Sequence, residues 1–331
     1  MQNKRVDIAI NVYGKPYQTA LSLLSLLRFS GKHVGRIYVV MEAQQPEYDP
    51  ISSLEWLPYM REPWGEPCGE PCGEQCEIYT PKHWNWINTT ITSRLHNDDY
   101  RLSMRYQYGF EKTQNDYLFL MHNDIYVFGD IISALMEEMG EAIIAGEVGQ
   151  CWNCPASMLK NWQEGQGFVQ ACNSTKYQQF KPSFDELAEI YNSAKGIPRV
   201  KPYWTQWSVE FKDNPWPLPE CRVNEWACLI DMRKARKVTM PKGPVLPFGA
   251  YVSAGSQTMD IGAAWFRGVH KLGFKASHVD IYQWLEHSMG HPKLFKQDLY
   301  EWSEKQAAER LEREYPVFVD WCRQNTDKMF K

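Results

Sequence analysis

Tyr117-Leu118-Phe119-Leu120-Met121 runs directly into His122-Asn123-Asp124, and this short stretch sets the architecture of the chain. Five apolar or aromatic residues in a row are too few for a helix and are typical of a strand buried on both faces. The run stops at three polar residues that can bind a metal ion or donate hydrogen bonds. In an open α/β sheet, ligands bind just outside the carboxyl ends of the strands. The stretch therefore predicts either a ligand site at these three residues or a plain turn between two strands.

A strand, a helix and a second strand open the chain. Val6–Tyr13 is rich in β-branched residues, Pro16 suits a first helical turn, and apolar residues recur at helical spacing as far as Leu27. Gly31 ends this helix, and Arg36–Glu42 forms the next strand. Such a unit implies a parallel sheet. We predict an α/β fold with a mostly parallel sheet flanked by helices, an irregular middle insertion and a C-terminal helix.

Two further helices are predicted from apolar spacing. One covers Asp98–Thr113, directly before the central strand. The other is a long, charged amphipathic helix from Gln297 to about Lys328, which we assign to packing and surface.

Composition limits the classes of function. The chain has 331 residues, 44% of them hydrophobic, which is enough for a sizeable core. A net charge of -4 gives no global attraction to nucleic acid or to an anionic membrane. The start of the chain enters a strand pattern without an apolar signal segment, and no apolar run approaches the ~20 residues of a membrane helix. We therefore expect a cytoplasmic protein without a nucleic-acid partner or an integral membrane segment.

Nine cysteines in such a chain indicate thiols or metal ligands rather than disulfides. Cys151 and Cys154 have the Cys-x2-Cys spacing that binds tetrahedral zinc, and Cys172 and Cys221 would complete a structural site. Ordinary buried thiols are the alternative. The tandem repeat at residues 65–76 spaces its cysteines by four, unlike the usual zinc pairs, and we interpret it as a flexible acidic loop.

Three segments together resemble the GT-A glycosyltransferases of family 2 type. Ile8–Tyr13, with its helix and second strand, resembles the nucleotide-binding start of that family. Tyr117–Asp124 resembles the strand that ends in the Asp-x-Asp metal motif. Thr258–Asp260, before a helix that ends at Leu272-Gly273-Phe274, resembles the segment with the catalytic base. The resemblance covers roughly residues 5 to 150 and 225 to 291 and implies a GT-A-like, Rossmann-like fold.

Two positions depart from the family pattern. His122 stands where the first Asp is usual, and Glu42 replaces an Asp at the end of the second strand. These departures leave open which metal and which donor nucleotide are bound.

The resemblance implies a metal-dependent glycosyltransferase of the hexosyltransferase type. It would move a sugar from a nucleotide-sugar donor to a glycan, lipid-linked or protein acceptor, and we expect inversion at the sugar. The implied division is a nucleotide-sugar-binding half (1–150), a Cys/Trp-rich insertion (151–224), an acceptor and catalytic half (225–295) and a C-terminal helix (296–331).

The resemblance also assigns roles to single residues. Asp124, with His122 and His287, is expected to hold Mn²⁺ or Mg²⁺, which neutralises the leaving diphosphate as a Lewis acid; a structural role for His287 is the alternative. Asp260 is the expected general base, with Glu225 in reserve, unless Asp260 is only a helix cap. The expected donor-binding residues are Asn11, Tyr13, Glu42, Arg105 and Asn123.

Two other functions are compatible with the sequence. A nucleotidyltransferase would share the fold and the metal, but it usually carries a Gly-rich loop with a basic residue after the first strand. Asn11–Pro16 offers only one Gly and one Lys, which disfavours it. A non-catalytic, zinc-stabilised binding module would suit the altered His122-Asn123-Asp124 triplet and the cysteines.

Overall fold

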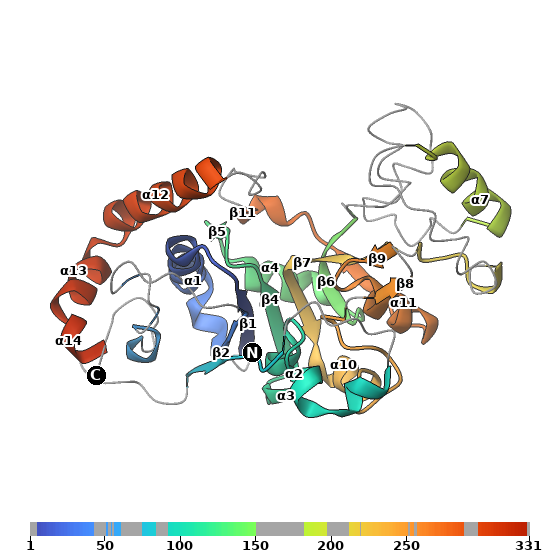
Figure 1. Ribbon diagram of the computed structural model, residues 1–331, viewed down its shortest axis with the longest axis horizontal. Helices are drawn as coiled ribbons and strands as arrows, with labels where there is room; N and C mark the ends of the chain where they lie inside the picture. Colours follow the sequence, from blue (N-terminus) through green and yellow to red (C-terminus); the bar gives the residue numbers. More distant parts are fainter. Residues whose placement is uncertain are drawn as a thin grey trace. The chain divides into compact units, whose positions relative to one another are not determined.

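The computed structural model describes residues 5–42, 51, 54, 56–60, 75–83, 92–149, 182–196, 212–218, 220–250, 252–254, 257–287 and 297–329. The chain forms two compact units, each built from segments that are distant in the sequence (Figure 1). Unit 1 comprises Met1–Pro81, Tyr108–Ala134 and Ile281–Lys331, and unit 2 comprises Lys82–Gln107 and Leu135–Asp280.

Unit 1 contains four parallel strands in the order β3-β2-β1-β4. Every residue of β1 and β4 is buried, as expected of strands covered on both faces. The predicted strand–helix–strand start is confirmed, because helix α1 (Pro16–Ser30) connects β1 to its parallel neighbour β2. The four strands are β1 (Val6–Val12), β2 (Val34–Met41), β3 (Cys76–Tyr79) and β4 (Tyr117–Met121).

Three strands of unit 2 lie in the order β10-β6-β7, in which β6 pairs in parallel with β10 and antiparallel with β7, while β8 and β9 pair separately. With the strands of unit 1, the first three belong to a mixed, mostly parallel sheet of seven strands flanked by helices, and the predicted fold class is confirmed. The elements of unit 2 include β6 (Ile144–Val148), α7 (Phe184–Ser193), β7 (Val223–Asp231), α10 (Met232–Val238), β8 (Val252–Ala254), β9 (Gln257–Met259), α11 (Ala263–Lys271) and β10 (Ala276–His278).

The predicted helix over Asp98–Thr113 is wrong in its middle. Two short helices replace it, α2 (Asp98–Leu102) and α3 (Gln107–Lys112). Between them Tyr106 adopts a left-handed φ of 64°, and the backbone of Arg105 pairs antiparallel with Gly249. A Cβ atom at residue 249 would overlap the carbonyl of Arg105, so only glycine permits this approach. A contact between distant segments thus overrides local helical spacing.

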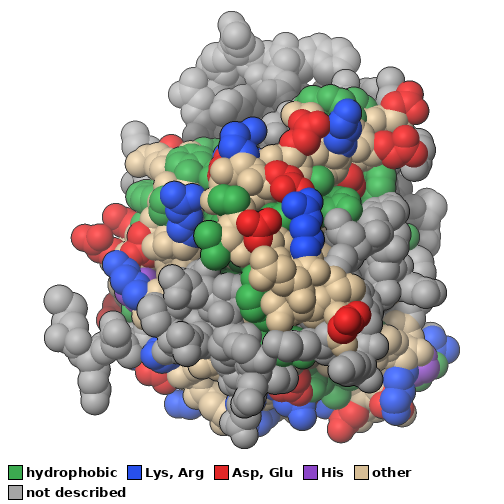
Figure 2. Space-filling view, turned by 90° about the vertical axis from the view of Figure 1, so that its left-hand side faces the viewer, with side chains coloured by type: hydrophobic (Ala, Val, Ile, Leu, Met, Phe, Trp, Pro, Cys, Tyr) green, Lys and Arg blue, Asp and Glu red, His purple; other side chains and the backbone are tan. Residues whose placement is uncertain are grey.

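The predicted C-terminal helix is also divided. It forms α12 (Gln297–Glu314), α13 (Pro316–Gln324) and α14 (Thr326–Met329). Pro316 explains the first break, because proline has no N–H to donate and is favoured only in a first helical turn. Figure 2 shows acidic and basic side chains interspersed on one face of the molecule. Helix α12 itself carries the ion pairs Lys305–Glu309 and Arg310–Glu314. Within the described part of the chain, every helix is too short or too polar to cross a membrane.

Helix α12 supplies the cap that α1 lacks. Lys15 precedes α1 and makes no side-chain cap hydrogen bond. Instead, Glu304 of α12 accepts hydrogen bonds from the backbone N–H of Tyr17 at 3.0 Å and of Gln18 at 3.3 Å. It also accepts one from the Gln18 side chain at 2.9 Å. The carboxylate is buried at the positive end of the α1 dipole, where a negative charge is stabilising. Helix α12 therefore caps α1, in addition to the packing and surface role that was predicted for it.

We predict that Glu304→Ala lowers the free energy of unfolding by about 1–3 kcal/mol, because buried donors at the start of α1 lose their acceptor. Urea denaturation measures the change. Glu309→Ala on the same helix is the matched control, since Glu309 is exposed and its contacts are a long ion pair with Lys305 at 3.9 Å and an exposed hydrogen bond from Gln306 at 3.1 Å. Its substitution is expected to stay within about 0.5 kcal/mol of the wild type. Equal effects of the two variants would contradict the capping role.

Candidate metal and nucleotide site

Three neighbouring parallel strands of unit 1 end at the same edge of the sheet. Ile10 of β1 lies beside Met121 of β4, and Val12 lies beside Met41 of β2. Polar residues at the ends of these strands therefore lie along one edge, where ligands bind in sheets of this kind. They are Asn11 and Tyr13 from β1, Glu42 from β2 and His122, Asn123 and Asp124 from β4.

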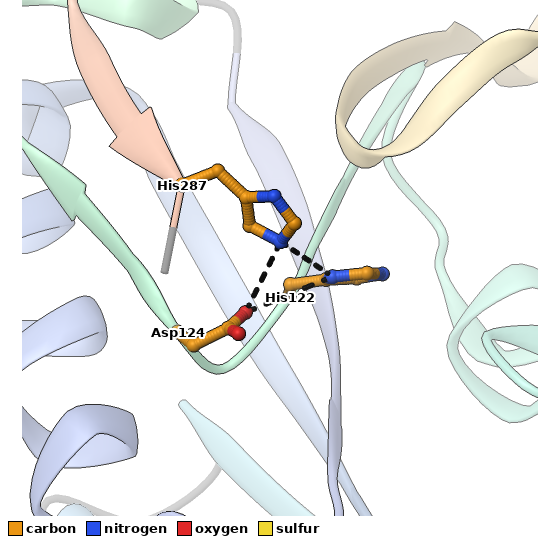
Figure 3. Close-up of side chains that lie close together, drawn as sticks. All are labelled: His122, Asp124 and His287. Carbon is orange, nitrogen blue, oxygen red and sulfur yellow. Dashed lines mark hydrogen bonds and ion pairs between the residues drawn. The ribbon is translucent and has the colours of Figure 1, made fainter. Parts of the chain in front are cut away.

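His287 joins this edge from a distant part of the sequence. The strand β5 (Ile125–Val127) pairs antiparallel with β11 (Leu285–His287), and His287 lies opposite Ile125. This register places His287 beside Asp124. Figure 3 shows the side chains of His122, Asp124 and His287 directed toward one another.

The three side chains have the spacing of a metal site. His287 Nε2 lies 3.4 Å from Asp124 Oδ1 and 3.2 Å from His122 Nδ1, and His122 Nδ1 lies 3.7 Å from Asp124 Oδ1. Ligand atoms bound at about 2.0–2.2 Å to one ion lie roughly 3–3.5 Å apart, so a small inward movement would let all three bind together. Two imidazoles and a carboxylate are ligands for a first-row divalent ion. The donor set therefore fits a metal ion.

Electrostatics keeps the carboxylate of Asp124 ionised. Burial by itself would raise its pKa, but the ammonium of Lys15 and the imidazoles of His287 and His122 hold the pKa of Asp124 well below its usual range. Lys15 Nζ lies 2.5 Å from Asp124 Oδ2, whereas both histidines face Oδ1. The two oxygens of this one carboxylate thus face different partners, the lysine on one side and the two histidines on the other.

Lys15 is a site residue that the sequence interpretation missed. The Gly14-Lys15-Pro16 turn at the end of the first strand could have indicated it. That turn was interpreted only as the entry to the helix and as a loop with too few glycines and basic residues for a nucleotidyltransferase. Gly14 and Lys15 both adopt left-handed backbone conformations, with φ of 64° and 58°. Two such residues in succession turn the chain sharply between β1 and α1, and the lysine side chain reaches Asp124.

Three further polar residues at this edge, Asn123, Asn11 and Glu42, connect the strand ends and the turn before α1. Asn123 donates hydrogen bonds to the carbonyl of Gly14 at 2.9 Å and to the hydroxyl of Thr19 at 3.0 Å, which fastens the turn that carries Lys15. Asn11 donates to Glu42 Oε1 at 2.6 Å, and both side chains are buried. This pair joins the ends of β1 and β2, and its role in donor binding stays a prediction.

The other two expected donor-binding residues differ in their surroundings. Tyr13 lies just past the end of β1, and 49% of it is exposed. Arg105 belongs to unit 2, where its backbone pairs with Gly249. Their predicted roles are not tested by these positions.

The two expected catalytic carboxylates share one arginine in unit 2. Arg222 Nη1 lies 2.7 Å from Glu225 Oε2, and Arg222 Nη2 lies 3.1 Å from Asp260 Oδ2. Arg222 and Glu225 are buried, whereas the side chain of Asp260 is 36% exposed. Gly262, not Asp260, precedes the first residue of α11, and Asp260 Oδ1 accepts a hydrogen bond from the N–H of Ile261, which lies before the helix. Asp260 is therefore not the N-cap of α11.

The predicted zinc site and the cysteine repeat fall mostly outside the described residues. Cys151, Cys154 and Cys172 are not described, and Cys221 is buried next to Arg222 in the sequence. Within the repeat, only Gln75 and Cys76 are described, and Cys76 begins β3. The zinc site stays a prediction.

Comparisons with known proteins give structural similarity without sequence similarity. No protein-family model matches the sequence, and no curated protein matches it. The structure of the galactosyltransferase LgtC with donor and acceptor sugar analogues is similar at 12% identity and a TM-score of 0.39, covering 92% of this chain and 94% of that one.

Two further similar structures are those of mouse xyloside xylosyltransferase 1 and of core-mannan synthase A from Aspergillus fumigatus in its Mn/GDP form. The first is 11% identical, covers 84% of this chain and 86% of that one, and has a TM-score of 0.36. The second is 10% identical, covers 70% and 61%, and has a TM-score of 0.34. The first two are named as glycosyltransferases and the third as a synthase of core mannan. Likeness at this level assigns no substrate to the chain.

Proposed function

We propose that this protein is a metal-dependent glycosyltransferase that moves a sugar from a nucleotide-sugar donor to an acceptor hydroxyl. The observation that carries the proposal is the group of His122, Asp124 and His287, whose ligand atoms lie within 4.8 Å of one another at the carboxyl edge of the sheet. A divalent ion held there would act as a Lewis acid on the diphosphate leaving group. The sequence resemblance supplies the reaction class, with a glycan, lipid-linked or protein acceptor.

Mn²⁺ is the ion that we propose, in preference to Mg²⁺. Mg²⁺ demands a nearly ideal octahedron of oxygen ligands, and this site offers one carboxylate and two imidazoles. Mn²⁺ accepts oxygen ligands and, as a first-row transition metal ion, resembles the metals that imidazole binds well more closely than Mg²⁺ does. The two histidines also bring no charge, so a bound ion keeps its attraction for the diphosphate.

The backbone around α1 disfavours the nucleotidyltransferase alternative. An enzyme of that kind would cradle phosphates on backbone N–H groups after the first strand, at the start of a helix. Here Glu304 accepts the N–H groups of Tyr17 and Gln18, and Tyr300 accepts that of Lys15 at 3.0 Å. A phosphate would have to displace a buried carboxylate to bind there.

A panel of nucleotide sugars tests the proposed function. Purified protein is incubated with each donor, and separately with nucleoside triphosphates and a sugar phosphate, with and without Mn²⁺. Release of the nucleoside diphosphate or of pyrophosphate is measured together with the metal content of the protein. We expect Mn²⁺-dependent release from one class of donor. Zinc in the protein without turnover of any donor would support the binding module instead, and release of pyrophosphate from a nucleoside triphosphate would support the nucleotidyltransferase.

A further inference from the structure

We propose that Lys15 couples metal binding to diphosphate binding: its ammonium weakens binding of the divalent ion alone and strengthens binding of the diphosphate. This inference rests on the proposed metal site at His122, Asp124 and His287. It adds Lys15 to that site and predicts how binding of the divalent ion and binding of the diphosphate depend on each other.

The geometry leaves one carboxylate to be shared by the Lys15 ammonium and a metal ion, if one binds. The ammonium of Lys15 lies 2.5 Å from Asp124 Oδ2, and the two imidazoles face Oδ1 at 3.4 and 3.7 Å. A metal ion held by Oδ1 and the imidazoles would therefore be a close neighbour of the ammonium. The side chain of Lys15 is 17% exposed and that of Asp124 only 3%, so the ammonium is the more accessible of the two charges. An anion that reaches the metal could also reach Lys15.

The backbone of Lys15 is fixed, so its ammonium is anchored from a rigid base. Its N–H donates to the hydroxyl of Tyr300 at 3.0 Å. Its carbonyl accepts hydrogen bonds from the N–H and from the hydroxyl of Thr19, at 2.8 and 2.7 Å. The preceding carbonyl, that of Gly14, accepts from Asn123. Contacts from α1, α12 and the turn after β4 thus hold the residue in its left-handed conformation.

Charge counting gives the direction of the coupling. Asp124 and Lys15 cancel one another, and imidazoles that bind a metal must be neutral. A divalent ion alone would therefore leave the site with two uncompensated positive charges. The nearby ammonium would also repel the ion, and the largely buried setting would strengthen this repulsion. A diphosphate brings at least two negative charges and compensates both. The ion alone should bind weakly and the ion with its diphosphate strongly, so that the site fills only with a donor.

The test is calorimetry on Lys15→Met, titrated with Mn²⁺ alone and then with inorganic pyrophosphate in the presence of excess Mn²⁺. Pyrophosphate probes diphosphate binding without any choice of nucleobase. We expect Lys15→Met to bind Mn²⁺ alone about tenfold or more tightly than the wild type, and Mn²⁺–pyrophosphate about tenfold or more weakly. Lys15→Arg keeps the charge and should keep both wild-type affinities within a few-fold.

Lys32→Met is the matched control. Lys32 also forms an ion pair with a carboxylate of unit 1, Asp130 at 2.8 Å, but its side chain is 65% exposed. This variant should change neither affinity, and melting curves confirm that each variant is folded.

The opposite signs distinguish coupling from a structural role. If Lys15→Met lowers both affinities together, or changes neither, the inference is overturned while the metal site stands. If the wild type binds no divalent ion, alone or with pyrophosphate, the proposed function fails with it.

Discussion

Asp124→Asn is expected to abolish Mn²⁺-dependent binding of the nucleoside diphosphate while the protein remains folded. Asp124 is the only carboxylate of the described metal group, and the amide of asparagine is neutral and a weaker ligand. The variant also leaves Lys15 as an uncompensated positive charge beside the site. Calorimetry with the nucleoside diphosphate, with and without Mn²⁺, measures the loss, and a melting curve measures the fold.

Asp130→Asn is a suitable control for this experiment. Asp130 is also an aspartate of unit 1, and it is bound to Lys32 and to the hydroxyls of Ser30 and Ser133. Asp130 also faces His33 at 3.4 Å. Because none of these partners belongs to the group of His122, Asp124 and His287, the control should retain Mn²⁺-dependent binding. Unchanged Mn²⁺-dependent affinity in Asp124→Asn would show that the three side chains hold no metal for the diphosphate.

Two members of the candidate metal group, His122 and Asp124, could be predicted because their signal is local. Five consecutive apolar residues predicted β4, and the polar triplet after them predicted the end of that strand. His287 was expected beside Asp124, and its Nε2 lies 3.4 Å from Asp124 Oδ1. The family resemblance led us to expect a histidine near the C-terminal end of the domain. The pairing of β5 with β11 explains how His287 comes to lie beside Asp124.

The residues that the sequence did not reveal act across long separations. Glu304 caps a helix that begins 288 positions earlier in the chain, at Pro16, and no local pattern could link the two. Lys15 reaches Asp124 only because the turn before α1 is left-handed at a residue other than glycine, which local preferences disfavour. The break at Tyr106 has the same origin, since the approach of Gly249 fixes it from outside the segment.

The shared arginine of unit 2 also lay beyond sequence reasoning. Asp260 was expected to be either a base or a cap, and the structure removes the second choice by starting α11 after Gly262. The ion pair with the buried Arg222 gives a different alternative to the base, in which Asp260 orients this arginine. The experiment on Asp260 must therefore separate a base from an anchor.

Asp260→Asn is expected to reduce turnover by about 10²–10⁴-fold, the range typical of a general base, if Asp260 takes the proton of the acceptor hydroxyl. Binding of the donor should hardly change, because a base acts on the acceptor and not on the diphosphate. Asparagine can still accept the hydrogen bond from the N–H of Ile261, now made at 2.9 Å, so the loop should keep its place. Steady-state release of the nucleoside diphosphate, calorimetry with the donor and a melting curve provide the three measurements.

Glu225→Gln is the comparison that separates the two roles of Asp260. Glu225 binds the same guanidinium at 2.7 Å, closer than Asp260 at 3.1 Å. If turnover depended only on the orientation of Arg222, this variant would lose at least as much activity as Asp260→Asn. A large loss in Asp260→Asn with near-normal turnover in Glu225→Gln identifies Asp260 as the base. The reverse pattern would move the role to Glu225, and equal losses in both variants would mean that the arginine, held by two carboxylates, is what the reaction needs.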